Sequence, residues 1–233
     1  MSARFVLLHS PLLGPISWLG VAEELRRRGQ SAEAPPWLRL SDIGGAYYPA
    51  LAGAMAAGLA QRPEPVILVA HSGAGALIPE LARMAPGKVV GVIFADAILP
   101  HPGRSWFDTA PPEMAERLRA GAQMGDLPRW ADWWPPGALQ KLVPDAHQLS
   151  SLTDELEALP VAYFDEPAPS AVWSGATAYL QLSGAYDLES QVAARSGWPL
   201  VRLSLHHLAM LTDQEIVATA LGSLSERLVT AHG

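Results

Sequence analysis

The feature that most constrains the fold is a series of short, uninterrupted apolar runs separated by helix-like patterns. Five such runs occur, at residues 5–8, 66–70, 89–95, 178–182 and 200–205, with a weaker one at 30–34. Runs of this length that are apolar on both faces are typical of parallel strands buried between helices. Helical spacing of apolar residues follows at 17–28, 46–61, 74–85 and 213–229. This repetition predicts an α/β protein with a mostly parallel, doubly wound sheet.

Residues 100–175 interrupt the alternation of strands and helices. The segment is rich in proline, and only 111–123 and 145–158 show a helical pattern. Five of the eight tryptophans of the chain lie in it, at positions 106, 130, 133, 134 and 173. We expect a core formed by residues 1–99 and 176–233, with a helical lid inserted over 100–175. Trp106, Trp130, Trp133 and Trp134 are expected to cover an apolar substrate cavity.

The stretch VILVAHSGAGALIPELA, residues 66–82, takes a strand directly into a helix. A tight strand-to-helix turn holds its central residue in an unfavourable backbone conformation, so the residues two before and two after must be small. Ala70 and Ala74 meet that condition around Ser72. The turn would raise the Ser72 hydroxyl above the sheet and point the amide of Gly73 at the same space, at a helix N-terminus. A serine among small residues is equally compatible with an ordinary strand-to-helix turn.

With the residues that follow it, this turn resembles the nucleophile elbow of the α/β-hydrolases. In that family the acid and the histidine follow the nucleophile along the chain. The segment Gly184-Ala185-Tyr186-Asp187 is similar to the family's acid motif, and His206-His207-Leu208 resembles its histidine loop. The resemblance implies that Ser72 is the nucleophile, that His207 is the general base and that Asp187 orients His207.

Two of these assignments have alternatives. Asp96 also follows a strand, where some members of the family carry their acid, and Asp187 could instead cap a helix over 188–195. His206 competes with His207 for the role of base. His71, beside the nucleophile, is expected to be structural because the elbow directs adjacent side chains elsewhere.

The segment His9-Ser10-Pro11-Leu12 is similar to the family's loop that supplies the second amide of the oxyanion hole. Pro11 has no N–H group, so the second donor would be the amide of Leu12 or the hydroxyl of Ser10. Hydroxynitrile lyases and their plant esterase relatives resemble the chain in carrying a small or hydroxyl residue at the position of Ser10. Losing one oxyanion donor costs ~10²–10³ in rate, so this loop leaves open a reaction other than hydrolysis.

Charge and composition limit the classes of partner. A net charge of −7 provides no basic face for nucleic acid or an anionic membrane. The absence of cysteine excludes thiolate metal sites and a cysteine nucleophile. The apolar run 5–8 is too short for a signal peptide, and no run approaches a membrane span. We expect a cytoplasmic protein that acts on a small molecule without metal or organic cofactor; the oligomeric state stays open.

These observations predict a serine hydrolase that cleaves a small-to-medium apolar ester, thioester or similar acyl substrate through an acyl-enzyme on Ser72. One alternative is a lyase, cyclase or dehydratase of specialised metabolism that uses Ser72 and His207 for proton transfer. A second alternative is a binding module that holds an apolar ligand without converting it. Haloalkane dehalogenase and epoxide hydrolase activities are disfavoured, because those relatives carry Asp where this chain has Ser72.

Overall fold

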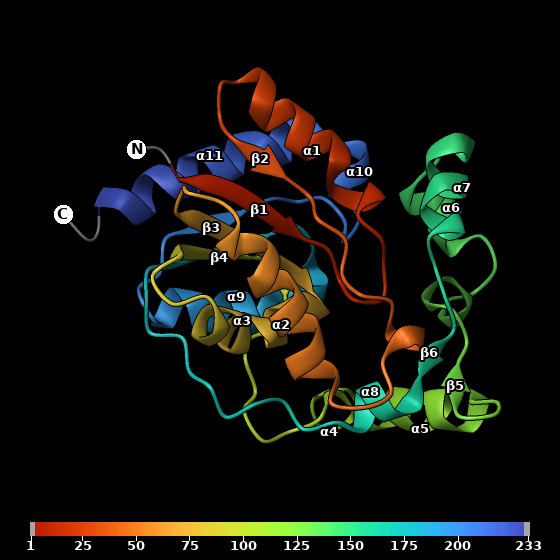
Figure 1. The fold of residues 1–233 in the computed structure, drawn as a ribbon. Coiled ribbons are helices and arrows are strands. Elements are labelled where there is room, and N and C mark those ends of the chain that lie inside the picture. The colour runs from red at the N-terminus through yellow and green to blue at the C-terminus, as the bar shows by residue number, and fades with distance from the viewer. Residues whose placement is uncertain (1–2, 231–233) are drawn as a thin grey trace.

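The computed structural model describes residues 3–230, and its centre is a six-stranded sheet (Figure 1). The strand order is β2-β1-β3-β4-β7-β8, and every neighbouring pair is parallel. The strands are β1 (Arg4–Leu8), β2 (Ala32–Glu33), β3 (Val66–Ser72), β4 (Val89–Ala97), β7 (Thr177–Gln181) and β8 (Leu200–Arg202). The predicted α/β class with a mostly parallel sheet is confirmed.

Helices cover both faces of the sheet. Figure 1 shows α1 and α11 on one face and α2, α3 and α9 on the other. The helices that flank the sheet are α1 (Ile16–Arg27), α2 (Tyr47–Ala60), α3 (Ile78–Met84), α9 (Asp187–Arg195), α10 (Ala209–Thr212) and α11 (Gln214–Thr230). Because both faces are covered, the central strands are apolar up to their carboxyl ends; Leu68, Val69 and Ala70 of β3 are all fully buried. Burial of such side chains stabilises the fold by roughly 1.5–3 kcal/mol for each large one.

The segment between β4 and β7 forms a separate group of short elements, seen at the right and bottom of Figure 1. They are α4 (Trp106–Thr109), α5 (Pro112–Gly121), β5 (Asp126–Leu127), the 3-10 turn η3 (Trp130–Trp133), α6 (Ala138–Leu142), α7 (Ala146–Asp154), β6 (Leu159–Pro160) and α8 (Val161–Asp165). Phe164 is fully buried there and lies 5.3 Å, 5.6 Å and 5.8 Å, between ring centroids, from Trp106, Phe107 and Trp133. The insertion therefore has a small aromatic core of its own.

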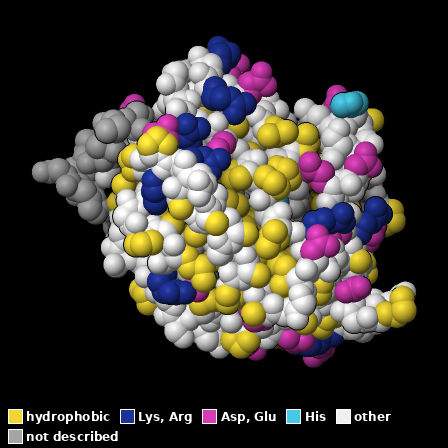
Figure 2. Space-filling view, in the orientation of Figure 1, with side chains coloured by type: hydrophobic (Ala, Val, Ile, Leu, Met, Phe, Trp, Pro, Cys, Tyr) yellow, Lys and Arg dark blue, Asp and Glu magenta, His cyan; other side chains and the backbone are white. Residues whose placement is uncertain are grey.

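The face of the molecule in Figure 2 carries side chains of both charges with hydrophobic ones between them. It has no continuous basic surface of the kind that binds phosphate backbones. Within residues 3–230, no helix is long and apolar enough to cross a membrane. The same part of the chain contains no group of three or more His, Asp or Glu side chains placed to hold a metal ion.

Candidate active site

Ser72 ends β3 in a strained turn. Its backbone has φ 54° and ψ −126°, and the 3-10 turn η2 (Gly73–Leu77) follows directly. Ala70 and Ala74 are fully buried, as the crowding of such a turn requires. The turn also requires glycine at position 75, which the sequence did not reveal, because a Cβ there would lie 1.9 Å from the carbonyl oxygen of Ile98. A non-glycine residue at positive φ is uncommon and is held there only by its surroundings.

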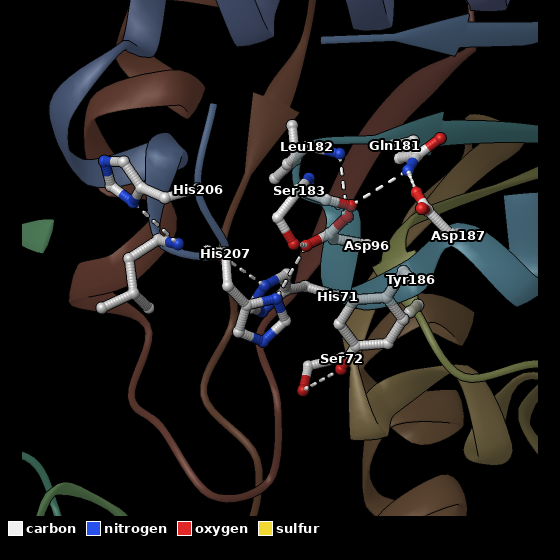
Figure 3. Close-up of polar contacts among 12 residues, drawn as sticks. His71, Ser72, Asp96, Gln181, Leu182, Ser183, Tyr186, Asp187, His206 and His207 are labelled. Atoms are coloured by element: carbon white, nitrogen blue, oxygen red, sulfur yellow. Dashed lines mark hydrogen bonds and ion pairs between the residues drawn. The ribbon is translucent and has the colours of Figure 1, made fainter. Parts of the chain in front are cut away.

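His207 follows β8 and pairs with a carboxylate. Its Nδ1 lies 2.9 Å from Oδ2 of Asp96, and the His207 side chain is 18% exposed while that of Asp96 is fully buried. An imidazole that donates from Nδ1 to a carboxylate presents Nε2 as an acceptor, which is the tautomer that a general base needs. Figure 3 shows His207 between Asp96 and Ser72.

Asp96, at the end of β4, is held by several donors besides His207. Its Oδ1 accepts hydrogen bonds from the amides of Leu182 and Ser183, at 2.8 Å and 3.0 Å. Its Oδ2 also accepts from the hydroxyl of Ser183 at 2.6 Å. A buried carboxylate is costly unless it is fully hydrogen-bonded, and these partners supply that compensation. The network also fixes the chain just beyond β7.

The structure corrects the predicted position of Asp187. Its carboxylate accepts a hydrogen bond from the side-chain amide of Gln181, whereas the carboxylate bonded to His207 is that of Asp96; Figure 3 shows Asp187 pointing away from the site. After Ser183 the chain enters a 3-10 turn, η4 (Gly184–Tyr186), and Asp187 begins α9. The N-cap of α9 is Tyr186 and no described side chain caps this helix, so Asp187 does not fill the capping role expected as its alternative; as a carboxylate in the first turn it is still favoured by the helix dipole. The acid beside His207 is Asp96, the alternative.

Tyr186 occupies the site instead, although no sequence pattern distinguishes it. Its hydroxyl lies 3.3 Å from Oγ of Ser72, and its ring stacks on that of His207 with centroids 5.0 Å apart and an interplanar angle of 15°. Burial raises the pKa of the Tyr186 phenol far above its usual value, so the hydroxyl stays protonated. The only signal in the sequence was its place inside the motif Gly184-Ala185-Tyr186-Asp187.

The two other histidines near the site have different positions. His71 is fully buried, and its Nε2 donates to the carbonyl oxygen of His207 at 3.0 Å. Burial holds the pKa of His71 well below its usual value, so the ring is neutral, and its centroid lies 4.4 Å from that of His207. His206 bonds to Thr212 through Nε2 at 3.0 Å and points away from Ser72 in Figure 3. His207, and not His206, therefore shares the cavity with Ser72.

A cavity of about 410 Å³ opens above Ser72. Its lining includes Ser72, Gly73 and His207 from the sheet edge, together with Leu12, Tyr186 and Glu189. The predicted tryptophans Trp106, Trp130, Trp133 and Trp134 all contribute to its wall, along with Met114 and Leu139. Burial raises the pKa of Glu189, which supplies the one acidic side chain among the described residues of this lining. The volume and the aromatic wall fit a small, largely apolar ligand.

Comparisons with known proteins agree with this architecture. No family model and no curated protein matches the sequence. Among solved structures, an extracellular alpha/beta-hydrolase from a Paenibacillus species is similar with a TM-score of 0.77 and 19% identity, covering 95% of this chain and 98% of that one. The chain has the α/β-hydrolase fold. The resemblance predicted from the motifs is thereby confirmed at the level of the fold.

Two further structures with the α/β-hydrolase fold are similar over nearly their whole length. A pyrethroid hydrolase from Sphingobium faniae JZ-2 has a TM-score of 0.70 and 19% identity, covering 97% of this chain and 98% of that one. Tomato methylketone synthase I, in complex with 2-tridecanone, has a TM-score of 0.74 and 15% identity, covering 98% and 99%. The fold thus hosts both a hydrolase and a synthase among these neighbours.

In this α/β-hydrolase fold, the loop after β1 faces Gly73. A Cβ on Gly73 would lie 3.4 Å from Oγ of Ser10 and 3.6 Å from Cδ of Pro11. Ser10 is 2% exposed, and its Oγ accepts the amide of Leu12 at 3.3 Å. Leu12 lines the cavity, whereas Ser10 does not. The Cδ of proline stands where another residue would carry its amide hydrogen, so this position offers a methylene group to the site.

Proposed function

We propose that the protein is a serine hydrolase of small-to-medium, largely apolar esters or thioesters. The observation that carries this proposal is the placement of Ser72, in a strained turn, at the base of an aromatic cavity that it shares with His207, whose Nδ1 is bound to buried Asp96. A serine hydroxyl becomes a good nucleophile only when a base takes its proton, and a neutral imidazole held by a carboxylate is such a base. In this proposal residues 100–175 act as the lid.

The reaction would proceed in two stages. In the first, Oγ of Ser72 forms a bond to the carbonyl carbon while its proton moves to Nε2 of His207, and Asp96 stabilises the resulting imidazolium. The amide of Gly73 donates to the oxyanion. The bond to the leaving oxygen then breaks as His207 returns the proton to it. In the second stage water attacks the acyl carbon while its proton moves to His207; the bond between that carbon and Oγ of Ser72 then breaks, and His207 returns the proton to Oγ as the acid product leaves.

The neighbouring structures support an apolar ligand. One is described as a pyrethroid hydrolase and another holds 2-tridecanone, a long-chain ketone. The cavity of the present chain has four tryptophans in its wall, which favour ligands of the same apolar character. A small-molecule substrate and a cytoplasmic location stay predictions of the sequence.

Pro11 favours a second candidate function. Because this residue offers no amide, the oxyanion of an ester intermediate would rely on Gly73 and on a Leu12 amide already bonded to Ser10. A proton-transfer reaction on Ser72 and His207, as in a lyase or a synthase, requires no tetrahedral oxyanion. The synthase among the similar structures is consistent with such chemistry on this fold.

Labelling with a fluorophosphonate tests the two candidates. We expect the probe to add to wild-type protein and to the Asp187→Asn control, and not to Ser72→Ala or His207→Ala. Turnover of p-nitrophenyl butyrate should follow the same pattern, with an acyl adduct on Ser72 visible by intact mass at early times. Folded wild-type protein that neither labels nor turns over the ester would exclude the hydrolase and favour proton transfer.

A further inference from the structure

Tyr186 touches both members of the reacting pair. Its hydroxyl is 3.3 Å from Oγ of Ser72, and its ring covers that of His207 at a centroid distance of 5.0 Å. The same side chain lines the cavity above Ser72. A packing residue would need only the ring contact, whereas this hydroxyl is directed at the nucleophile, as Figure 3 shows.

The phenol keeps a proton that it can donate. Burial, reinforced by the nearby carboxylates of Asp96 and Glu189, raises its pKa and keeps its proton in place at neutral pH. In the proposed mechanism the hydroxyl proton of Ser72 passes to His207, so it is not available to Tyr186. The arrangement that satisfies all three groups has Tyr186 donating to a lone pair of the Ser72 oxygen.

The sheet order places Tyr186 on the opposite side of Ser72 from the oxyanion donors. The loop with Ser10 and Leu12 follows β1, on one side of β3, while Tyr186 follows β7, which lies beyond β4 on the other side. In a tetrahedral intermediate on Ser72, the oxyanion faces Gly73 and the β1 loop. The leaving oxygen faces His207, which must protonate it, and therefore also faces Tyr186.

We propose that Tyr186 is a catalytic residue that donates a hydrogen bond to the leaving oxygen of the substrate as the acyl–oxygen bond breaks. This inference rests on the proposed hydrolase function. Tyr186 keeps its proton throughout: the leaving oxygen receives its proton from Nε2 of His207, and the phenol stabilises the negative charge that develops there before the transfer is complete. Tyr186 thereby adds a hydrogen-bond donor on the leaving-group side of Ser72, opposite the β1 loop in which Pro11 lacks an amide.

The test compares leaving groups in wild type and Tyr186→Phe. The variant keeps the ring that stacks on His207 and removes only the hydroxyl. Esters of one acid are used, p-nitrophenyl butyrate and ethyl butyrate, and kcat/KM is measured because it reports acylation. Nitrophenolate leaves readily without help, whereas ethoxide needs stabilisation. We expect kcat/KM to fall ~10²-fold for ethyl butyrate and only a few-fold for the nitrophenyl ester.

Tyr47→Phe is the matched control, because it removes a tyrosine hydroxyl on α2 that does not line the cavity. It should leave both rates unchanged. Equal losses for both esters in Tyr186→Phe would mean that Tyr186 only supports the structure, and would overturn the proposal. If Tyr186→Phe fails to fold, Tyr186→Leu takes its place with the same pair of esters. Absence of turnover and of fluorophosphonate labelling in wild type would instead reject the hydrolase function itself.

Discussion

At the scale of single residues, Asp96 combines a strained backbone with a buried charge. Its φ is +45°, a region in which Asp and Asn are several-fold enriched among non-glycine residues. That conformation turns the carboxylate at the end of β4 toward His207 and the amides beyond β7. The carboxylate that bonds His207 therefore comes from the end of β4, and not from the turn after β7 to which the sequence pattern had assigned it.

Replacing this carboxylate should abolish most of the activity. We expect Asp96→Asn to lower kcat/KM for p-nitrophenyl butyrate by ~10²–10⁴, because the amide cannot stabilise the imidazolium or hold the required tautomer. Asn tolerates the positive φ, so circular dichroism should show an intact fold. Asp187→Asn is the matched comparison and should retain nearly full activity. The opposite ranking of the two variants would return the acid to Asp187.

Replacing Pro11 is expected to increase ester hydrolysis. Its Cδ lies 3.6 Å from the position of a Cβ on Gly73, at the place where another residue would present an amide hydrogen. Pro11→Ala restores that donor, and we expect kcat/KM for p-nitrophenyl butyrate to rise about tenfold, below the full value of an oxyanion donor because the loop loses rigidity. Ester hydrolysis that is unchanged or slower in Pro11→Ala would show that this amide does not reach the oxyanion.

Ser72 and His207 could be predicted because each lies in a short motif whose function depends on its immediate neighbours. Asp96 could be named only as an alternative to Asp187, and Tyr186 could not be identified. Both follow from how the ends of β4 and β7 meet across the sheet and from a turn after Ser183 that directs Tyr186 inward and Asp187 outward. Such juxtapositions depend on φ angles and on contacts between segments far apart in the chain.

At the scale of elements, the N-termini of α1 and α2 are capped by glutamates from the insertion, residues 100–175. The N-cap residue of α2 is Ala46, with φ 54° and no side-chain acceptor. Glu166 supplies the missing acceptor, because its carboxylate accepts hydrogen bonds from the amides of Tyr47 and Tyr48 at 2.7 Å and 2.9 Å. Glu155 likewise accepts from the amide of Ile16 at the start of α1, at 3.0 Å. Local sequence gave no sign of these caps, since each spans more than a hundred residues.

Removing the distant cap should destabilise the protein measurably. We expect Glu166→Ala to lower the free energy of unfolding by about 1–2 kcal/mol, because two amides at the positive end of α2 lose a charged acceptor. Glu116→Ala, on the exposed face of α5, is the control and should change stability by less than about 0.5 kcal/mol. Urea denaturation followed by circular dichroism measures both. Equal midpoints for the two variants would contradict the capping role.

At the scale of the whole molecule, buried neutral histidines make stability depend on pH. Burial lowers the pKa of His9 to about 4 and holds that of His71 well below its usual value. In the unfolded chain both would titrate near ~6.5. Between these values the unfolded state binds protons that the native state does not, so stability falls as pH decreases.

We therefore expect the free energy of unfolding to fall between pH 7 and pH 5.5, with a slope approaching ~1.4 kcal/mol per pH unit for each of the two histidines. His9→Asn should reduce the slope, whereas His147→Gln, an exposed residue of α7, should leave it unchanged. The measurement is a series of urea titrations across this range. A stability that is constant or increases toward pH 5.5 would show that His9 and His71 accept protons in the folded state.

The overall architecture was predictable because apolar runs and helical spacing recur along the whole chain, and each of the five main predicted strands is found. The internal arrangement of residues 100–175 was not, because its short elements are held by an aromatic core of Trp106, Phe107, Trp133 and Phe164 whose pairing no local period reveals. Only the tryptophan content indicated that the segment would enclose an apolar space.

The glutamates of the insertion bear on how a ligand could enter. Glu155 and Glu166 bind helix amides, and Glu157 accepts from Ser41 and from the amide of Leu40. A hinge-like swing of the whole insertion would break all of these bonds together and fray the first turns of α1 and α2. Ligand exchange by local movement within residues 130–142, which contribute Trp130, Trp133, Trp134 and Leu139 to the cavity wall, leaves these bonds intact. We therefore expect the ligand to enter through movement of residues 130–142 while the rest of the insertion stays in place. The rate of ligand entry and release would then be set by the motion of the tryptophan side chains.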